Sequence, residues 1–199
     1  MTSTGVSWRD FLGLDDAALL AQCEFDRFRA SGPGGQKRNV TDSAVRLRHR
    51  PTGLAATASE SRSQHENRRS ALTRLRRTLA LGMRAPVSLD PPQGIAAPQG
   101  LATPQGLATP QGADPPPELA AVRTSGGRIA VGRRDARFLP AVAVLFDLLE
   151  ALEWRLRDVA PRAGLSTAAI GRLLAQDAAV WRAANERRRA LALPPLRAR

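Results

Sequence analysis

Cysteine is nearly absent from this sequence, and histidine is scarce. Cys23 is the only cysteine, so no disulfide can form within the chain. His49 and His65 are the only histidines, and no group of cysteine and histidine residues has the spacing of metal ligands, so we expect neither a metal nor a cofactor. Long apolar runs are missing too, since none approaches the ~20 residues that a membrane-spanning helix needs. The N-terminus has neither the basic start nor the apolar core of a signal peptide, and we expect a cytoplasmic monomer without membrane contact.

Lysine is also nearly absent, although the chain is strongly basic. Lys37 is the only lysine, yet the formal net charge is +12 over 199 residues. Arginine therefore carries almost all of the positive charge, and its planar guanidinium group suits phosphates and stacked bases. RNA is the partner that this composition predicts. A genomic bias toward arginine and alanine is the alternative explanation of the same excess.

Residues 31–36 read Ser-Gly-Pro-Gly-Gly-Gln, and this segment points to a specific chemistry. Two adjacent glycines after a proline predict a loop tip whose backbone can take positive φ and approach another molecule closely. Gln36 follows at the apex. Its neutral amide can donate and accept hydrogen bonds, but it is neither a strong base nor a strong nucleophile at neutral pH. Chemistry at this tip would therefore depend on positioning water and on stabilising developing charge.

The residues after the tip extend the pattern. The run from Ser31 to Arg46, the turn sequence from Arg50 to Gly53 and the run from Ser61 to Ala71 follow in that order. Together they resemble the catalytic domain of class I peptide chain release factors and of their shorter ribosome-rescue relatives, over residues 20–82. The resemblance implies a ribosome-dependent hydrolase that cleaves the ester between peptide and tRNA in the peptidyl transferase centre.

The resemblance also assigns roles to individual residues. Gly34, Gly35 and Gln36 would be catalytic, and a glutamine methyltransferase would be expected to modify Gln36 at N5. The ribosome, through its rRNA, and peptidyl-tRNA are the implied partners. The contacts to rRNA and tRNA would come from Ser31, Lys37, Arg38, Asn39, Arg46, Arg62, Ser63, Gln64, Arg68 and Arg69.

Two departures from the family pattern refine this expectation. The segment Lys37-Arg38-Asn39-Val40 keeps positive charge but shifts it toward the tip, which alters the expected rRNA contacts and leaves hydrolysis expected. Full release factors carry a separate codon-reading domain ahead of the loop, whereas only residues 1–30 precede it here. We therefore expect codon-independent rescue of stalled ribosomes, not stop-codon decoding.

Hydrophobic periodicity predicts a small α+β domain over residues 1–82. A short helix is expected before residue 22, with Asp15 and Asp16 at its N-terminus. Alternating apolar and polar residues predict strands at 23–29, 44–50 and 54–58, the last two joined by a turn. Cys23 is expected to be a small core residue of the first strand. The stretch 63–81 is predicted to be one long helix because these apolar residues recur at helical spacing: Ala71, Leu72, Leu75 and Leu79.

The remainder of the chain divides into a linker and a helical region. Residues 83–118 contain a Pro-Gln-Gly hexapeptide repeat, which cannot bury a core and predicts a disordered linker. Residues 119–199 are predicted to hold a brief hairpin at 122–131, a helix over 137–159, a helix after Ser166 and another from Asp177. The helices resemble a helix-turn-helix arrangement. A run of arginines favours RNA contact by this region, and simple packing is the alternative: Arg187, Arg188 and Arg189.

Two classes of function fit these observations. The first is the ribosome-dependent peptidyl-tRNA hydrolase. The second is a non-catalytic RNA- or DNA-binding regulatory protein that uses its helical C-terminal region. The intact Gly34-Gly35-Gln36 favours the hydrolase, because a pure binder has no physical need for two glycines and a glutamine at one apex. His65 is expected to be a surface or rRNA contact and not a general base, since no nucleophile can be paired with it from the sequence.

Overall fold

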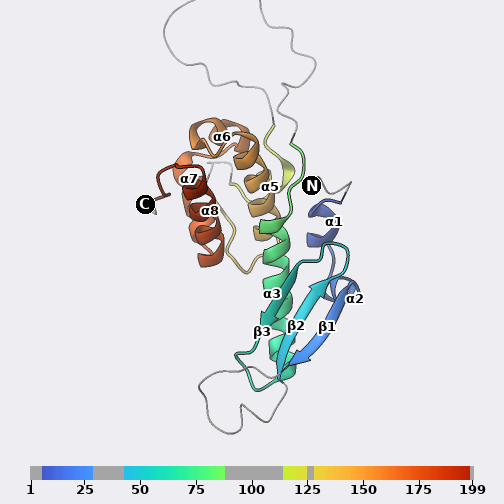
Figure 1. Cartoon of the computed structure of the whole chain (residues 1–199). Coiled ribbons are helices and arrows are strands. Elements are labelled where there is room, and N and C mark those ends of the chain that lie inside the picture. Colours follow the sequence, from blue (N-terminus) through green and yellow to red (C-terminus); the bar gives the residue numbers. More distant parts are fainter. Residues whose placement is uncertain (1–5, 29–42, 88–113, 125–127, 198–199) are drawn as a thin grey trace, which may run out of the picture. The chain divides into compact units, whose positions relative to one another are not determined.

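The computed structural model describes residues 6–28, 43–87, 114–124 and 128–197. The chain divides into two compact units, Met1–Arg84 and Ala85–Arg199. In the first unit the elements are α1 (Arg9–Leu12), α2 (Asp16–Ala21), β1 (Cys23–Phe28), β2 (Ala44–His49), β3 (Ala55–Ala58) and α3 (Gln64–Gly82) (Figure 1). This unit is therefore of the α+β class that the sequence predicts: a small three-stranded sheet and one long helix.

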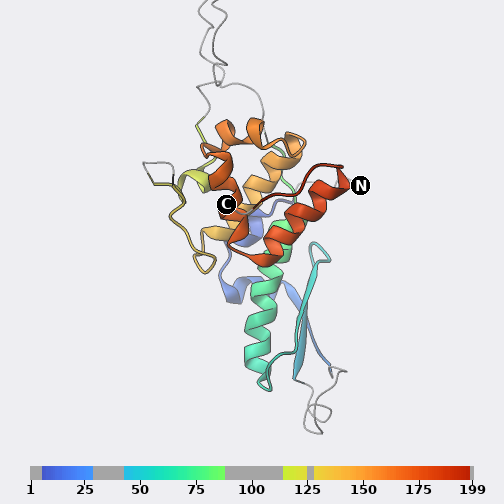
Figure 2. The ribbon, with the colours of Figure 1, turned by 90° about the vertical axis from the view of Figure 1, so that its left-hand side faces the viewer.

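The sheet is antiparallel with the strand order β1-β2-β3, and α3 covers one of its faces (Figures 1 and 2). Within β2, Val45 and Leu47 are buried while Arg46 and Arg48 are exposed, as the alternation predicts. The apolar stripe of α3 is buried along its full length: Ala71, Leu72, Leu75 and Leu79. The core of the first unit thus lies between α3 and the inner face of the sheet.

Local capping explains where the helices of this unit begin. Asp15 accepts a hydrogen bond from the backbone N–H of Ala18 and caps α2, and Ser63 accepts one from Glu66 and caps α3. The predicted short helix with Asp15 and Asp16 at its N-terminus is confirmed as α2, and a further short helix, α1, precedes it.

The second unit contains α4 (Pro117–Ala120), α5 (Phe138–Ala151), α6 (Leu156–Ala163), α7 (Thr167–Ala175) and α8 (Ala178–Ala190), with an isolated bridge between Arg123 and Ile129 (Figure 1). Helix α5 is buried on almost every side, from Ala141 to Leu149. The predicted single helix over 137–159 is wrong, since α5 ends at Ala151 and α6 begins at Leu156.

The break between α5 and α6 is a turn built from residues in the left-handed conformation. Glu153 and Trp154 have φ of 52° and 59°. This turn sends Trp154 back into the core, where its ring lies 5.3 Å from that of Phe146 in an edge-to-face arrangement and is 1% exposed. Burial of the large indole therefore overrides the helical periodicity that continues across the turn.

The predicted linker, residues 83–118, falls largely outside the described part of the chain, which resumes at Asp114. Among the described residues, no helix combines the length and the apolar character that crossing a bilayer requires.

Candidate functional site

The strand pair β1 and β2 frames the segment that carries the predicted catalytic residues. The two strands pair from Cys23 with His49 through to Phe28 with Ala44, so the chain leaves and re-enters the sheet at one end. Residues 29–42 make this connection and lie outside the described residues. That segment includes all of these predicted site residues: Ser31, Gly34, Gly35, Gln36, Lys37, Arg38 and Asn39.

Asn67 fixes the point at which this segment returns to the sheet. Its side-chain Nδ2 donates to the carbonyl oxygens of Ser43 at 2.6 Å and Ser61 at 2.8 Å. Its Oδ1 accepts from the backbone N–H of Ser61 at 3.0 Å, and the side chain is 1% exposed. A fully hydrogen-bonded buried amide of this kind holds the backbone on either side in one place. The sequence analysis missed Asn67, although its position four residues before Ala71, in line with the apolar stripe, is the signal of a buried polar group.

The predicted contacts at the start of α3 have different surroundings. The hydroxyl of Ser63 is engaged as the helix cap, and its backbone N–H donates to the hydroxyl of Ser61 at 3.0 Å. Gln64 is half-buried, whereas Arg62 is exposed. Of these three residues, Arg62 is therefore the one whose side chain is most accessible to an RNA phosphate.

The predicted basic contacts lie on two different faces of the unit. Arg46 is on the open face of the sheet, where its Nε lies 3.3 Å from Asp26. Arg68 is on α3, with its guanidinium carbon 5.6 Å from the centre of the Phe25 ring at the other face. The fold thus separates Arg46 from Arg68 and Arg69, which the sequence analysis grouped in one set.

A hollow of about 660 Å³ lies between α2 and α3 and brings Arg68 and Arg69 together with His65. Its floor is apolar, with Ala17, Leu20, Ala21 and Leu72, and Asp16 lies at its edge.

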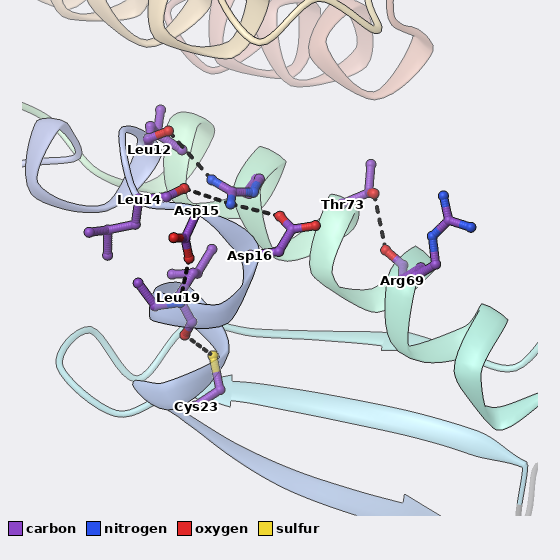
Figure 3. Close-up of polar contacts among 10 residues, drawn as sticks. Leu12, Leu14, Asp15, Asp16, Leu19, Cys23, Arg69 and Thr73 are labelled. Atoms are coloured by element: carbon purple, nitrogen blue, oxygen red, sulfur yellow. Dashed lines mark hydrogen bonds and ion pairs between the residues drawn. The ribbon is translucent and has the colours of Figure 1, made fainter.

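The carboxylate of Asp16 is held by Arg76, whose guanidinium group lies 2.8 Å from it and also donates to the carbonyl oxygens of Leu12 and Leu14 (Figure 3). Because this ion pair offsets the one acidic group at the edge, the rim of the hollow is basic, as an anionic ligand requires.

His49 and Cys23 are both engaged in hydrogen bonds within the fold. His49 is fully buried between Thr52 Oγ1 at 2.8 Å and Gln22 Oε1 at 3.0 Å, and its burial lowers its pKa. The thiol of Cys23 donates to the carbonyl oxygen of Leu19 at 3.2 Å (Figure 3). Burial raises the pKa of Cys23, and the nearby charge of Arg50 lowers it by less. Cys23 is half-buried and not a full core residue. His49 is therefore closed to a substrate by burial and by its two hydrogen bonds, and Cys23 is held as the thiol, which is the weaker nucleophile.

The arginines of α8 also differ from the prediction. Arg187 makes a bidentate ion pair with Glu150, with N–O distances of 2.8 and 2.9 Å. Arg188 is buried and donates to the carbonyl oxygens of Trp154 and Pro194, each at 2.8 Å. Arg189 is exposed. Arg187 and Arg188 thus hold the second unit together, and the expectation that all three arginines of this run face RNA is wrong for Arg188.

Comparison with known proteins finds similarity over the part of the chain that contains the sheet and α3. Residues 20–88 match the family model of the RF-1 domain. Peptide chain release factor 1 of Thermus thermophilus is 52% identical over 65 residues, which are 33% of this chain and 18% of that protein. Peptide chain release factor 2 of Paramagnetospirillum magneticum is 52% identical over 59 residues, 30% of this chain and 16% of the relative. Peptide chain release factor 1 of Mycoplasma capricolum is 57% identical over 51 residues, which are 26% of this chain and 14% of that protein.

Residues 20–88 therefore belong to the RF-1 domain family of class I peptide chain release factors. The matched part of the chain spans less than a fifth of the length of these relatives.

Proposed function

We propose that this protein hydrolyses the ester between peptide and tRNA in the peptidyl transferase centre of the ribosome, as a release factor. The observation that carries the proposal is an intact Gly34-Gly35-Gln36 within the segment that matches the RF-1 domain. The same tripeptide stands between two strands whose ends are paired at Phe28 and Ala44. A loop carried on a rigid sheet can present one apex to a substrate held by another macromolecule.

In the proposed mechanism, Gln36 orients the attacking water through its backbone N–H and side-chain amide, while Gly34 and Gly35 permit the backbone shape. His49 does not act as base in this mechanism, since it is buried and hydrogen-bonded on both ring nitrogens. Asn67 acts as a positioning residue, because it fixes Ser43 at the end of the catalytic segment. The rate gain would then come from positioning and from electrostatic stabilisation.

The proposed contacts to rRNA and tRNA fall into two groups. Arg62 with Arg68 and Arg69 would bind phosphates on the α3 side, and Arg46 would bind on the open face of the sheet. Ser63 and Gln64 would contribute through exposed atoms at the start of α3. We further propose that Lys37, Arg38, Asn39 and Ser31 contact RNA beside the apex, that Gln36 is methylated at N5 by a glutamine methyltransferase, and that the protein acts as a cytoplasmic monomer.

Replacement of Gly35 by alanine tests the catalytic proposal. Gly35→Ala should lower the rate of peptide release about 10²-fold or more. A small displacement of the group that orients the attacking water has a large effect on a rate that depends on orientation. Ribosome binding should be unchanged. A single-turnover assay of peptide release, with ribosome pelleting in parallel, measures both.

Gly132→Ala is the matched control, since Gly132 has no positive φ and no neighbour within 4 Å of an added Cβ. Release at the normal rate by the Gly35→Ala protein would overturn the catalytic proposal and favour the alternative, a non-catalytic nucleic-acid-binding protein.

We also propose that release does not depend on the codon in the A site, which is the behaviour of a rescue factor. The match to the RF-1 domain covers residues 20–88, the segment that carries the proposed catalytic tripeptide. Ribosomes programmed with sense, stop and truncated messages should therefore be released at rates that depend on the length of mRNA beyond the A site and not on codon identity. A strong preference for stop codons would contradict this and assign decoding to another part of the protein.

A further inference from the structure

Helices α6 and α7 are joined by a tight turn at Gly164. Gly164 has φ of 61°, and an added Cβ would lie 2.3 Å from Nη1 of Arg123. The backbone N–H groups of Gly164 and Leu165 donate to Pro161 and Ala160 and close the end of α6. Ser166 then caps α7 by accepting from the backbone N–H of Ala169. The pair has the form of a helix-turn-helix, in which the second helix is held rigidly at the surface.

Helix α7 has one buried and one open face. Its buried face is apolar, with Ala169, Ile170, Leu173 and Leu174. Its open face carries small side chains and one arginine: Thr167, Ala168, Arg172 and Ala175 are exposed. The C-terminal segment runs past this helix, since the carbonyl oxygen of Arg197 lies 3.9 Å from the Cβ position of Gly171. This segment covers the face at Gly171, and Thr167, Ala168, Arg172 and Ala175 remain exposed beside it.

The arginines of the second unit divide into those that the fold uses and those that it leaves available. Hydrogen bonds within the unit engage Arg123, Arg137, Arg155, Arg187 and Arg188. By contrast, the following arginines of α6, α7, α8 and the C-terminal segment have no hydrogen bond or ion pair with any residue that the structure describes: Arg157, Arg162, Arg172, Arg182, Arg189 and Arg197.

Acidic residues do little to offset this charge. Asp177 caps α8 through two backbone N–H groups, which leaves Asp158 and Glu186 as the other carboxylates on these helices. The surface of α6 to α8 and the C-terminal segment is therefore positively charged, and its complement is a polyanion.

We propose that this surface binds duplex RNA through its phosphates, with the open face of α7 against the minor groove. Base reading in the major groove of DNA uses arginine, asparagine and glutamine side chains, and the open face of α7 offers only Arg172. The minor groove of A-form RNA is wide and shallow and displays 2′-hydroxyl groups, which suits a smooth face with the hydroxyl of Thr167. Recognition is then by shape and charge and not by sequence. The inference concerns residues 156–197 and is independent of the proposed catalysis.

The test compares two charge-matched double variants of the full chain. Arg172→Gln with Arg182→Gln removes two charges from the proposed surface. Arg133→Gln with Arg134→Gln removes two exposed charges from a loop of the same unit, neither of which is paired with a residue that the structure describes. Affinity for a 16-base-pair RNA duplex is measured by fluorescence anisotropy at several salt concentrations. The first variant should lower the slope of log K against log salt by about 2, and the control should change it by much less.

An uncharged substitution tests whether RNA contacts the open face of α7 directly or is attracted only by the net positive charge. Ala168→Gln adds volume but no charge to the open face of α7, and it should weaken RNA binding about tenfold if the groove meets this face. Ala178→Gln at the exposed start of α8 is its control and should have no effect. Equal effects of the two double variants, wild-type affinity of Ala168→Gln, or tighter binding of a DNA duplex of the same length would each overturn the proposal. Release at saturating protein is a separate measurement, so the two proposals fail independently.

Discussion

His49 is a residue whose environment decides its chemistry. It lies in β2 with its ring 4.4 Å from that of Phe11 in an edge-to-face contact, and each ring nitrogen has a side-chain partner. Burial favours the neutral imidazole, so the pKa of His49 in the folded protein is below its ordinary value of 6.5. The histidine therefore belongs to the core and contributes to stability, not to catalysis.

The lowered pKa of His49 predicts a pH-dependent stability. Because the unfolded chain binds a proton near pH 6.5 while the folded chain still excludes it, this contribution is fully present above 6.5 and is lost as the pH falls through the folded pKa. Urea denaturation at about pH 5 and about pH 7.5 should show a lower free energy of unfolding at the lower pH. His49→Gln should be less stable at both values but should lose this part of the pH dependence. The same pH dependence in both proteins would assign it to other groups.

At the scale of elements, α5 and α6 end in the same backbone motif, but different residue types occupy its left-handed position. Helix α6 ends at Gly164, and α5 ends with the same pair of hydrogen bonds, from Glu153 to Glu150 and from Trp154 to Leu149. In α5, however, the left-handed position holds Glu153, with φ of 52°. A glycine at this position indicates the end of a helix, whereas a glutamate does not. This explains why one helix was predicted over 137–159 and the end of α5 was missed.

Substitutions at these two positions should have opposite effects. Gly164→Ala should destabilise the second unit by about 1 to 3 kcal/mol, because alanine is strained at positive φ and its Cβ would displace the guanidinium group of Arg123, which donates to the carbonyl oxygen of Gly164. Glu153→Gly should stabilise it by about 0.5 to 1 kcal/mol, because glycine adopts the same φ without strain. Thermal and urea denaturation measure both.

Gly132→Ala is again the control for the first of these substitutions, since it has open space around it and should stay within about 0.5 kcal/mol of the wild type. If Gly164→Ala were as mild as Gly132→Ala, the turn between α6 and α7 would not have the rigidity on which the proposed RNA surface depends.

At the scale of the whole molecule, two units each carry a core of their own: α3 against the sheet in Met1–Arg84, and the buried α5 in Ala85–Arg199. The matched RF-1 segment ends at residue 88, near this division. Under the proposed function, the first unit would perform the reaction and the second would raise the local concentration of the protein on its target.

Deletion of residues 85–199 tests that division. The protein concentration for half-maximal release should rise, by about 10²-fold or more if the second unit acts as a tethered anchor, while the rate at saturation should hold. Single-turnover release over a concentration series separates the two quantities. Circular dichroism of the truncated protein establishes that the first unit is folded. An unchanged half-maximal concentration would remove the anchor role from the second unit, and a lower saturated rate would place part of the reaction there.

Features that depend on neighbouring residues could be predicted from the amino-acid sequence. The alternation in β2, the apolar stripe of α3 and the helix start after Ser166 are local patterns, and each was found where the pattern placed it. The release-factor resemblance of the segment around Gln36 is local in the same sense. Such features follow from backbone periodicity and from hydrogen bonds within one turn.

Features whose partners lie far along the chain became visible in the folded structure and not before. His49 contacts Gln22 across 27 residues, and Arg188 reaches the carbonyl of Trp154 across 34. Burial at these distances converts a titratable histidine and a cation into parts of the core, and it separates the arginines that hold the fold from those left free to bind. Periodicity does not encode this outcome, because desolvation and hydrogen bonding depend on the complete set of neighbours that the fold brings together.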